Sequence, residues 1–442
     1  MCCQRLAVCQ LPLLAAASAG LMIQIDGFDN IFLNYARYGA RSMTIKKSPI
    51  ESNIEWRKAN AAQIADGLQS LRAKTLAVFD AYATADCLTV PYADELNPPL
   101  WELGHVAWFQ EYWIGCNQQR DLGIHYDANH ARLPSALAQA DSWYDSSMVS
   151  HASRWNLPML EPEACKDYLA KTLNQTLALL AQAGDSDDAL YFYRLALFHE
   201  AMHLEAAIYM AQAVGVALDV NLEVKFTPNL IATQATNTPA KCQFTHLKQT
   251  IYLGYQDSGF AFDNELGTHQ VQVAAFDIDS RCVNWGDYLS FVEATARSLP
   301  RYVRRSASDY EKQEFGTWKP LSLQATAVHL SLAEAQDYCI WAGRRLPTEA
   351  EWELAAATIT ANKSSNEFQW GEVWEWTAST FASYPDFVAH PYLDYSAPWF
   401  GSRQVLRGAC VATQPMMKNI KYRNYFTPER TDIYAGFRTC GM

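Results

Sequence analysis

The sequence of 442 residues contains no C-x-x-C pair, although it has 11 cysteines. An odd number of scattered cysteines is not the pattern of a disulfide framework, and the close pairs that ligate structural zinc are missing. We therefore expect reduced thiols and a cytoplasmic protein.

Positive charge is also scarce. The formal net charge is −12, and no stretch of the chain is notably basic. A nucleic-acid-binding protein presents a basic patch or stripe, so this balance argues against nucleic acid as a partner.

A long, uninterrupted apolar run is missing as well. The most apolar stretch, Leu6–Ile23, contains Gln10 and Pro12 and is too short to predict a membrane span. It follows Arg5 and superficially resembles a secretory signal, but Met43 is a second natural start. We interpret residues 1–44 as a dispensable tail, and we expect no membrane partner.

What the sequence does have is length and apolar mass. Half of its residues are hydrophobic, with 14 tryptophans and 23 tyrosines, and the chain is too long for one ordinary core. A polar stretch at 219–245 reads as a linker. It divides a first domain, 45–218, from a second domain, 246–442, in which short strand-like runs and turns predominate.

The first domain has four stretches with helical spacing of apolar residues, at 54–82, 100–116, 163–183 and 189–214. Together they predict an antiparallel four-helix bundle with one long crossover, a scaffold that builds metal sites from inward side chains. The irregular stretch 121–162 is longer than an ordinary connection, which favours a functional loop.

Three histidines are placed to meet inside this bundle. His199 and His203 are one helical turn apart, and His105 belongs to the apolar stripe 101, 105, 108, 112 of the second helix. Three imidazoles on one metal would leave positions open for a substrate and a small gas. Glu205 lies off this stripe, so we expect it to hydrogen-bond a ligand and not to bind the metal.

Two other interpretations of the histidine pair remain open at this stage. Positions 199–203 fit H-E-x-x-H, the pattern of a zinc hydrolase in which Glu200 would be the base. Alternatively, the histidines are satisfied residues of a helical core without a metal.

The second domain carries several motifs in order: Gly343-Arg-Arg-Leu-Pro-Thr-Glu-Ala-Glu-Trp-Glu, Val373-Trp-Glu-Trp-Thr-Ala-Ser, Val405-Leu-Arg-Gly and Gly436-Phe-Arg. Within the first, Thr348 and Glu351 have the spacing of a helix capping box. These motifs resemble the sulfatase-modifying-factor domain, which implies a C-type-lectin-like α+β fold. With a DinB-like four-helix bundle in front, the chain resembles the ergothioneine-type sulfoxide synthases. These are non-haem Fe(II) enzymes that use O₂ to attach sulfur to C2 of the imidazole of hercynine.

The resemblance implies roles for individual residues. The tyrosine that delivers a proton or a hydrogen atom in the family is matched by Tyr392, with Tyr395 beside it. Tyr425 stands where the family places an aromatic side chain near the substrate, and a π face suits the quaternary ammonium of hercynine. The three iron ligands are matched by His105, His199 and His203.

Departures from the family concern the sulfur donor. Met202 stands where relatives often have a glutamine, and Phe426 replaces an aspartate. Of the arginines that bind an amino-acid thiol, only Arg154 and Arg430 are offered here. Such a site fits an uncharged donor better than cysteine or γ-glutamylcysteine. The segment 97–111 also resembles the selenoneine synthase branch, which joins a selenosugar to hercynine. A sugar could stack on or hydrogen-bond Trp143, Tyr144, Ser146 and Trp155.

The resemblance leaves a thiol donor open as the alternative. A formylglycine-generating oxidase is a third possibility, because that chemistry needs a reactive cysteine pair. Cys410 and Cys440 are the candidates by composition, but the bundle would then have no role.

Overall fold

The computed structural model describes residues 55–218, 242–307, 309–361 and 368–442, with the side chains of 359–361 left out. The expected tail at 1–44, most of the expected linker and the first residue of the expected first helix lie outside these ranges. Within them, no helix combines the length and the apolar character that crossing a membrane requires.

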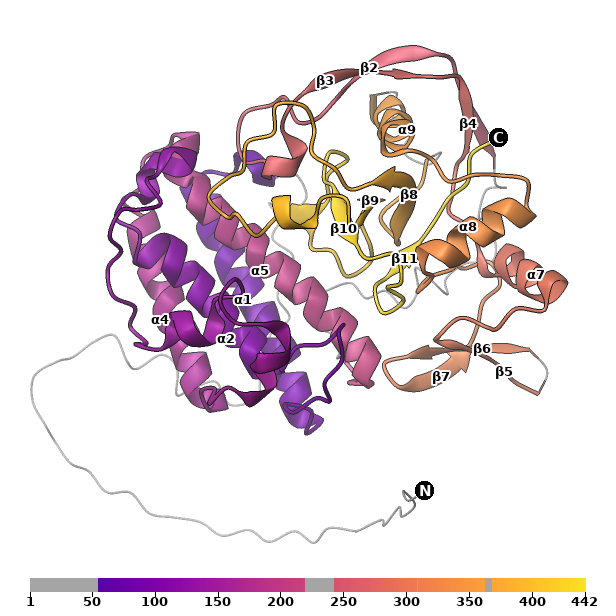
Figure 1. The fold of residues 1–442 in the computed structure, drawn as a ribbon. Coiled ribbons are helices and arrows are strands. Elements are labelled where there is room, and N and C mark those ends of the chain that lie inside the picture. The colour runs from indigo at the N-terminus through magenta and orange to yellow at the C-terminus, as the bar shows by residue number, and fades with distance from the viewer. Residues whose placement is uncertain (1–54, 219–241, 308, 362–367) are drawn as a thin grey trace, which may run out of the picture. The chain divides into compact units, whose positions relative to one another are not determined.

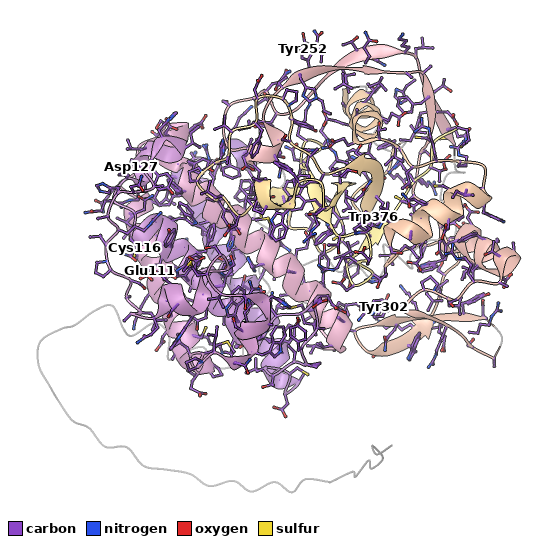
Figure 2. All side chains as sticks on the ribbon, in the orientation of Figure 1. Glu111, Cys116, Asp127, Tyr252, Tyr302 and Trp376 are labelled. Carbon is purple, nitrogen blue, oxygen red and sulfur yellow. The ribbon has the colours of Figure 1, made fainter. Side chains whose placement is uncertain are left out.

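The predicted four-helix bundle is confirmed (Figure 1). Its long helices begin and end within a few residues of the predicted bounds, except that the first starts later. They are α1 Ala61–Thr84, α2 Pro99–Gln110, α4 Pro162–Leu180 and α5 Asp187–Val214. Helix α2 continues as a π-helical turn, Glu111–Gly115, beside Cys116 in Figure 2.

Local sequence explains where these helices start and stop. Asn60 and Gln63 form a capping box at the start of α1, and Pro99 occupies the first position of α2. The side chain of Ser186 accepts from the backbone N–H of Ala189, and α5 ends at Gly215, whose φ of 79° suits glycine.

The stretch between α2 and α4 is largely irregular, as the sequence predicts. It contains three short helical segments: η3 Arg120–His125, α3 Ala140–Tyr144 and η4 His151–Asn156. A further turn, η1 Trp56–Lys58, precedes α1.

The second domain combines small sheets with short helices, which confirms the predicted α+β class. A four-stranded sheet has the order β10-β9-β8-β11, with strands Asn424–Phe426, Gln404–Gly408, Trp374–Thr380 and Ala435–Gly436. Two strand pairs are β1 Gln243–His246 with β4 Phe276–Asp279, and β2 Gln249–Leu253 with β3 His269–Val273. A three-stranded sheet consists of β5 Val303–Arg305, β6 Tyr310–Glu314 and β7 Thr317–Pro320. Strand β1 begins shortly before residue 246, the expected start of the domain.

Three helices accompany these sheets: α7 Trp285–Thr295, α8 Leu332–Trp341 and α9 Glu349–Ala361. The predicted capping box in front of α9 is confirmed, because Thr348 and Glu351 exchange hydrogen bonds between their side chains and backbone N–H groups. Single helical turns are η5 Asp263–Glu265, η6 Ala397–Trp399 and η7 Pro415–Met417.

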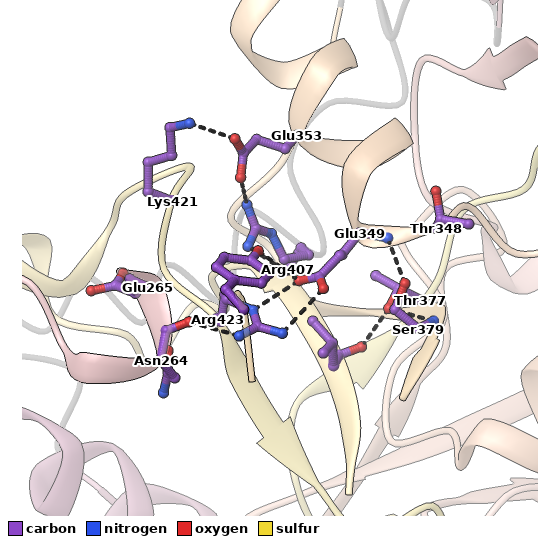
Figure 3. A network of polar contacts seen from close by, with 12 residues as sticks. Asn264, Glu265, Thr348, Glu349, Glu353, Thr377, Ser379, Arg407, Lys421 and Arg423 are labelled. Atoms are coloured by element: carbon purple, nitrogen blue, oxygen red, sulfur yellow. Dashed lines mark hydrogen bonds and ion pairs between the residues drawn. The ribbon is translucent and has the colours of Figure 1, made fainter. Parts of the chain in front are cut away.

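A buried ionic network ties α9 to the start of β10 (Figure 3). The guanidinium of Arg423, which is 1% exposed, donates to Glu349 from two nitrogens, at 2.9 and 3.1 Å. Arg407 and Lys421 both pair with Glu353. Removing one member of such a network would leave a buried charge uncompensated, so the network fixes the segment that follows Arg423.

Helix α5 joins the bundle to the second domain. One hydrophobic cluster contains buried residues from both. Polar contacts add to it: the indole of Trp374 on β8 donates to Glu205 at 2.6 Å, and Gln212 exchanges hydrogen bonds with the backbone at 313 and 315. The helix that carries two of the three histidines is therefore held from both sides.

Candidate metal centre

The three histidines meet inside the bundle. His105 comes from α2, while His199 and His203 come from α5, and one ring nitrogen of each lies within 4.8 Å of the others. His105 and His199 are each 2% exposed. The sequence prediction that these side chains share one face is thus met by the geometry.

His105 is oriented through its Nδ1 atom. That nitrogen lies 2.7 Å from the backbone oxygen of Tyr144, at the end of α3. Because a carbonyl oxygen only accepts, Nδ1 carries the proton and Nε2 keeps its lone pair. Trp101 stacks on the imidazole at 4.8 Å between ring centroids. Burial and the neighbouring His203 lower the pKa of His105 to about 3, so the ring is neutral.

His203 is oriented in the same way by a carboxylate. Its Nδ1 lies 2.5 Å from Oε2 of Glu102, one turn before His105 on α2. Burial opposes ionisation of Glu102, but attraction to His203 and the hydrogen bond between them outweigh it and lower the pKa of the carboxyl. The amide of Asn97 donates to the other oxygen at 2.6 Å. A carboxylate on the far nitrogen fixes a ligand's tautomer and raises its basicity.

His199 supplies the clearest sign that something else belongs here. Its Nε2 is buried and has no hydrogen-bond partner among the described residues. Phe109 covers the ring face at 3.5 Å, almost parallel. Burial and the other two histidines hold the pKa of His199 well below its ordinary value. A neutral imidazole with an orphaned nitrogen facing two others is suited to binding a metal ion.

The donor set fits a divalent first-row metal. Three neutral imidazoles suit iron as well as zinc, and they leave coordination positions for other ligands. The residues that would hold the ion are His105, His199 and His203.

Two glutamates behave differently from their sequence-based interpretations. Glu200, the base of the zinc-hydrolase alternative, is 2% exposed and pairs with Arg72 through both oxygens at 2.8 and 3.0 Å. It also accepts from Thr75 at 3.0 Å, so it has no free oxygen for a base. The expectation that Glu205 holds a ligand is wrong, because its partners are Trp374 and Tyr209. Glu102 is the carboxylate that contacts a candidate ligand, His203.

Tyr392 lies beside the histidines. Its ring centroid is 5.9 Å from that of His199 and 5.0 Å from that of Phe109. Burial, with the carboxylates of Asp394 and Asp145, raises the pKa of the Tyr392 hydroxyl above its ordinary value. The hydroxyl therefore stays protonated at neutral pH.

The loop that carries Tyr392 and Tyr395 is held by one aspartate. Asp263 in η5 accepts from the backbone N–H of His390 at 3.3 Å and from the hydroxyl of Ser396. Both ends of the segment 390–396 are thus fixed to the same carboxylate. The position of Tyr392 over the bundle follows from this attachment.

Tyr395 belongs to a second layer of the site. Its hydroxyl lies 3.0 Å from that of Tyr422, which in turn donates to the sulfur of Met202 at 3.6 Å. Tyr425 stacks on Phe381 at 3.9 Å between centroids. Its hydroxyl donates to the backbone oxygen of Tyr395. These contacts place an aromatic wall next to Met202, which precedes the candidate ligand His203.

Of the arginines expected at the donor site, Arg430 is already engaged, whereas Arg154 keeps a buried Nε with no hydrogen-bond partner among the described residues. Arg430 donates to both oxygens of Asp432 at 2.5 Å and lies over the ring of Phe426. Arg154 donates to Asn97 at 2.9 Å and lies 3.8 Å from the ring of Trp101, which stacks on His105. Arg154 is therefore close to the centre, whereas no described contact links Arg430 or Phe426 to it.

The loop residues suggested for a sugar are mostly structural. Trp143 offers its backbone oxygen to the indole of Trp101 at 2.8 Å, and the indole of Trp155 donates to Val90. The ring of Tyr144 packs where a Cβ at Gly104 would lie, so only glycine fits there. The hydroxyl of Tyr144 is buried and has no hydrogen-bond partner within the described ranges. No described contact involves Ser146.

The cysteines of the formylglycine alternative are not a reactive pair. Cys410 belongs to one hydrophobic cluster and Cys440 to the other. Both thiols are free, and burial raises the pKa of each to about 12. A reactive cysteine needs a lowered pKa, so neither suits that chemistry.

Sequence reasoning missed Glu102, Tyr422 and Asp263. Glu102 had a usable signal, since it lies one turn from His105 on the inward face of the same predicted helix. Tyr422 and Asp263 had none, because their partners are far away in the sequence.

Comparison with known proteins agrees with this architecture. The chain matches the DinB superfamily over residues 67–207 and the sulfatase-modifying factor enzyme 1-like domain over residues 239–372 and 369–441. It is 28% identical to the hercynine oxygenase of Mycobacterium tuberculosis, over 85% of this chain and 98% of that protein. It is 26% identical to the hercynine oxygenase of Mycolicibacterium smegmatis, over 85% and 97%. Ergothioneine biosynthesis protein 1 of Schizosaccharomyces pombe is 23% identical, over 77% of this chain and 51% of that protein.

The fold and the histidine site thus define a class: enzymes in which a DinB-superfamily bundle precedes a sulfatase-modifying factor enzyme 1-like domain. Within that class, the chain is homologous to the hercynine oxygenases, and it is an oxidoreductase. The formylglycine-generating enzyme of Streptomyces coelicolor is 24% identical, over 41% of this chain and 82% of that protein.

Proposed function

We propose that this protein is an Fe(II)- and O₂-dependent enzyme that forms a carbon–selenium bond at C2 of the hercynine imidazole, with a selenosugar as donor. The observation that carries the proposal is the site itself: three imidazoles that meet in the bundle, two of them buried and that of His203 partly buried, with Tyr392 beside them, in a chain homologous to hercynine oxygenases.

The chain's own residues have distinct tasks in this proposal. Fe(II) held by the three histidines would supply the chemistry of O₂ activation. Glu102 and the backbone oxygen of Tyr144 keep two ligands in the tautomer that presents Nε2. The rings of Tyr422 and Tyr425 offer π faces for the trimethylammonium group of hercynine. The hydroxyl of Tyr392 stays protonated beside the reacting atoms and serves as the proton donor of the reaction.

The proposal is tested by reconstituting metal-free protein with either Fe(II) or Zn(II). Each form is incubated with hercynine, O₂ and a selenosugar, and the products are identified by mass spectrometry. We expect product with Fe(II) only. Equal activity with Zn(II), or an unchanged hercynine pool with every donor, would contradict the proposal.

Two features support an uncharged donor. Arg430 is neutralised by Asp432, and Arg154, which donates to the neutral side chain of Asn97 and keeps its Nε without a partner among the described residues, is the one cation left of the expected arginines. The carboxylate of an amino-acid thiol would lose water on entering the site and would find only the single cation of Arg154 to compensate it. A sugar needs only hydroxyl partners and an aromatic surface.

We expect the kcat/KM of a selenosugar to exceed that of cysteine and of γ-glutamylcysteine by at least about tenfold. A factor of this size corresponds to the free-energy cost of leaving one buried polar group without a partner. The measurement is a competition assay with both donors present and hercynine saturating. Sulfoxide from a thiol as the main product would favour the second candidate, an ergothioneine-type sulfoxide synthase, for which the similarity to hercynine oxygenases speaks.

Tyr392→Phe is expected to retain metal and hercynine binding but to slow product formation about 100-fold or more, because the ring is kept and only the proton donor is lost. Single-turnover product formation, together with metal analysis, gives both readouts. Tyr395→Phe serves as the matched control, since its hydroxyl contacts Tyr422 in the layer behind. Normal turnover in Tyr392→Phe with an inactive Tyr395→Phe would assign the role to Tyr395.

A further inference from the structure

A second cavity lies away from the histidines, where the C-terminal end of α5 meets the β5–β6–β7 sheet. Its volume is about 170 Å³. It begins at Gln212, nine residues after His203, which is roughly 14 Å further along the helix. Figure 2 labels Tyr302 in its wall, beside this sheet. None of its lining residues belongs to the candidate metal centre.

Three polar side chains that line this cavity have no hydrogen-bond partner within the part of the chain that the structure describes. They are the indole N–H of Trp285, the hydroxyl of Tyr302 and Nδ1 of His329. The three residues are 2%, 6% and 6% exposed. Buried polar groups are almost always satisfied, so three orphans in one cavity indicate a missing partner.

The cavity is built mainly of rings. His329 lies between Tyr302 and Tyr434, with centroids 4.7 and 4.6 Å from its own. Its backbone has a φ of 64°, which is uncommon for a residue other than glycine and is found most often where a side chain must be aimed. Flat aromatic walls favour a flat, ring-shaped occupant.

The charge balance beside the cavity is positive. Lys312 and Lys319, both in its lining, share the single carboxylate of Glu314. Lys319 is 47% exposed and reaches solvent, so this trio carries one net positive charge towards the entrance. An anion entering here would meet an attractive field.

We propose that this cavity binds a small aromatic carboxylate. A cavity of about 150 Å³ is large enough for benzene, so the volume accommodates one ring with a carboxylate. The N–H of Trp285 and the O–H of Tyr302 are donors without acceptors, and a carboxylate offers two acceptor oxygens. The site does not depend on the function proposed above, because it shares no residue with the metal centre.

In the test, benzoate is titrated into the full-length protein, and its binding is measured by titration calorimetry. We expect one saturable site with a dissociation constant on the order of 0.1–1 mM, appropriate for so few atoms. Benzamide, which keeps the acceptor but not the charge, and toluene, which has neither, should bind about tenfold more weakly or not at all.

Two variants remove the donors and keep the rings: Trp285→Phe and Tyr302→Phe. Each should weaken benzoate binding about tenfold, whereas Trp318→Phe, which removes an indole on β7 outside the lining, should not. Thermal melts establish whether each variant is folded. If Trp285→Phe does not fold, Tyr302→Phe alone provides the test. The proposal would be overturned if benzoate did not bind at millimolar concentration, if it bound the two variants as tightly as the unsubstituted protein, or if toluene bound as tightly as benzoate.

Discussion

Replacing His199 by alanine is expected to abolish metal binding and activity while the helical fold persists. The orphaned Nε2 would be lost, and two imidazoles cannot hold the ion in the geometry of three. His105→Ala and His203→Ala should behave alike. Metal content per protein chain, measured by mass spectrometry after dialysis, should fall at least about tenfold. Losing only a residue that hydrogen-bonds a metal ligand already lowers metal affinity by about this factor.

The matched control is His269→Ala, which removes a partly buried histidine on β3 in the second domain. It should keep both metal and turnover. Circular dichroism separates loss of metal from loss of fold. Full metal occupancy in any one of the three ligand variants would remove that residue from the donor set.

The second large effect concerns stability. Arg72→Met should lower the free energy of unfolding by about 3–5 kcal/mol, because Glu200 would remain as a buried charge without its partner. Arg72 is 4% exposed and donates to Glu200, to the side chain of Gln110 and to the backbone oxygen of Leu169. Urea unfolding followed by circular dichroism measures the loss.

Arg304→Met is the control for that measurement. Arg304 pairs with Glu311 at 2.6 Å, but its side chain is 50% exposed, so the cost should be at most about 1 kcal/mol. The double variant Arg72→Met, Glu200→Met should recover part of the stability, because no lone charge remains. If it also keeps its turnover, Glu200 is excluded as a base. A destabilisation no larger than that of Arg304→Met would mean that water reaches Glu200.

Periodicity and end signals predicted most of the bundle. The predicted start of α2 at residue 100 lies one residue after the observed start at Pro99, and the stripe through Trp101 and His105 placed that histidine inward. Both inferences depend on residues within a few turns of one another. The sheet order and the short strands of the second domain were not predicted in detail, and its class followed from motifs.

The contacts that decide chemistry could not be predicted, because they join distant positions. Glu102 meets His203 over 101 residues of chain, and Tyr422 meets Met202 over 220. Arg72 pairs with Glu200 over 128 residues of chain. Because that partner could not be predicted, the pattern H-E-x-x-H left Glu200 available as the base of a zinc hydrolase. The spacing of residues within one helix or strand does not indicate which side chain from another element will pair with a carboxylate.

The two halves of the site come from different domains, and this separates two properties that an engineer would wish to change independently. The candidate metal ligands belong to α2 and α5, whereas Tyr392 and the wall around Tyr425 belong to segments 390–396 and 422–426. Each segment is anchored by a buried carboxylate at its edge, Asp263 or Glu349. Exchanging those two segments between relatives, with their anchors kept, is therefore the shortest route to a changed substrate pocket beside unchanged candidate metal ligands.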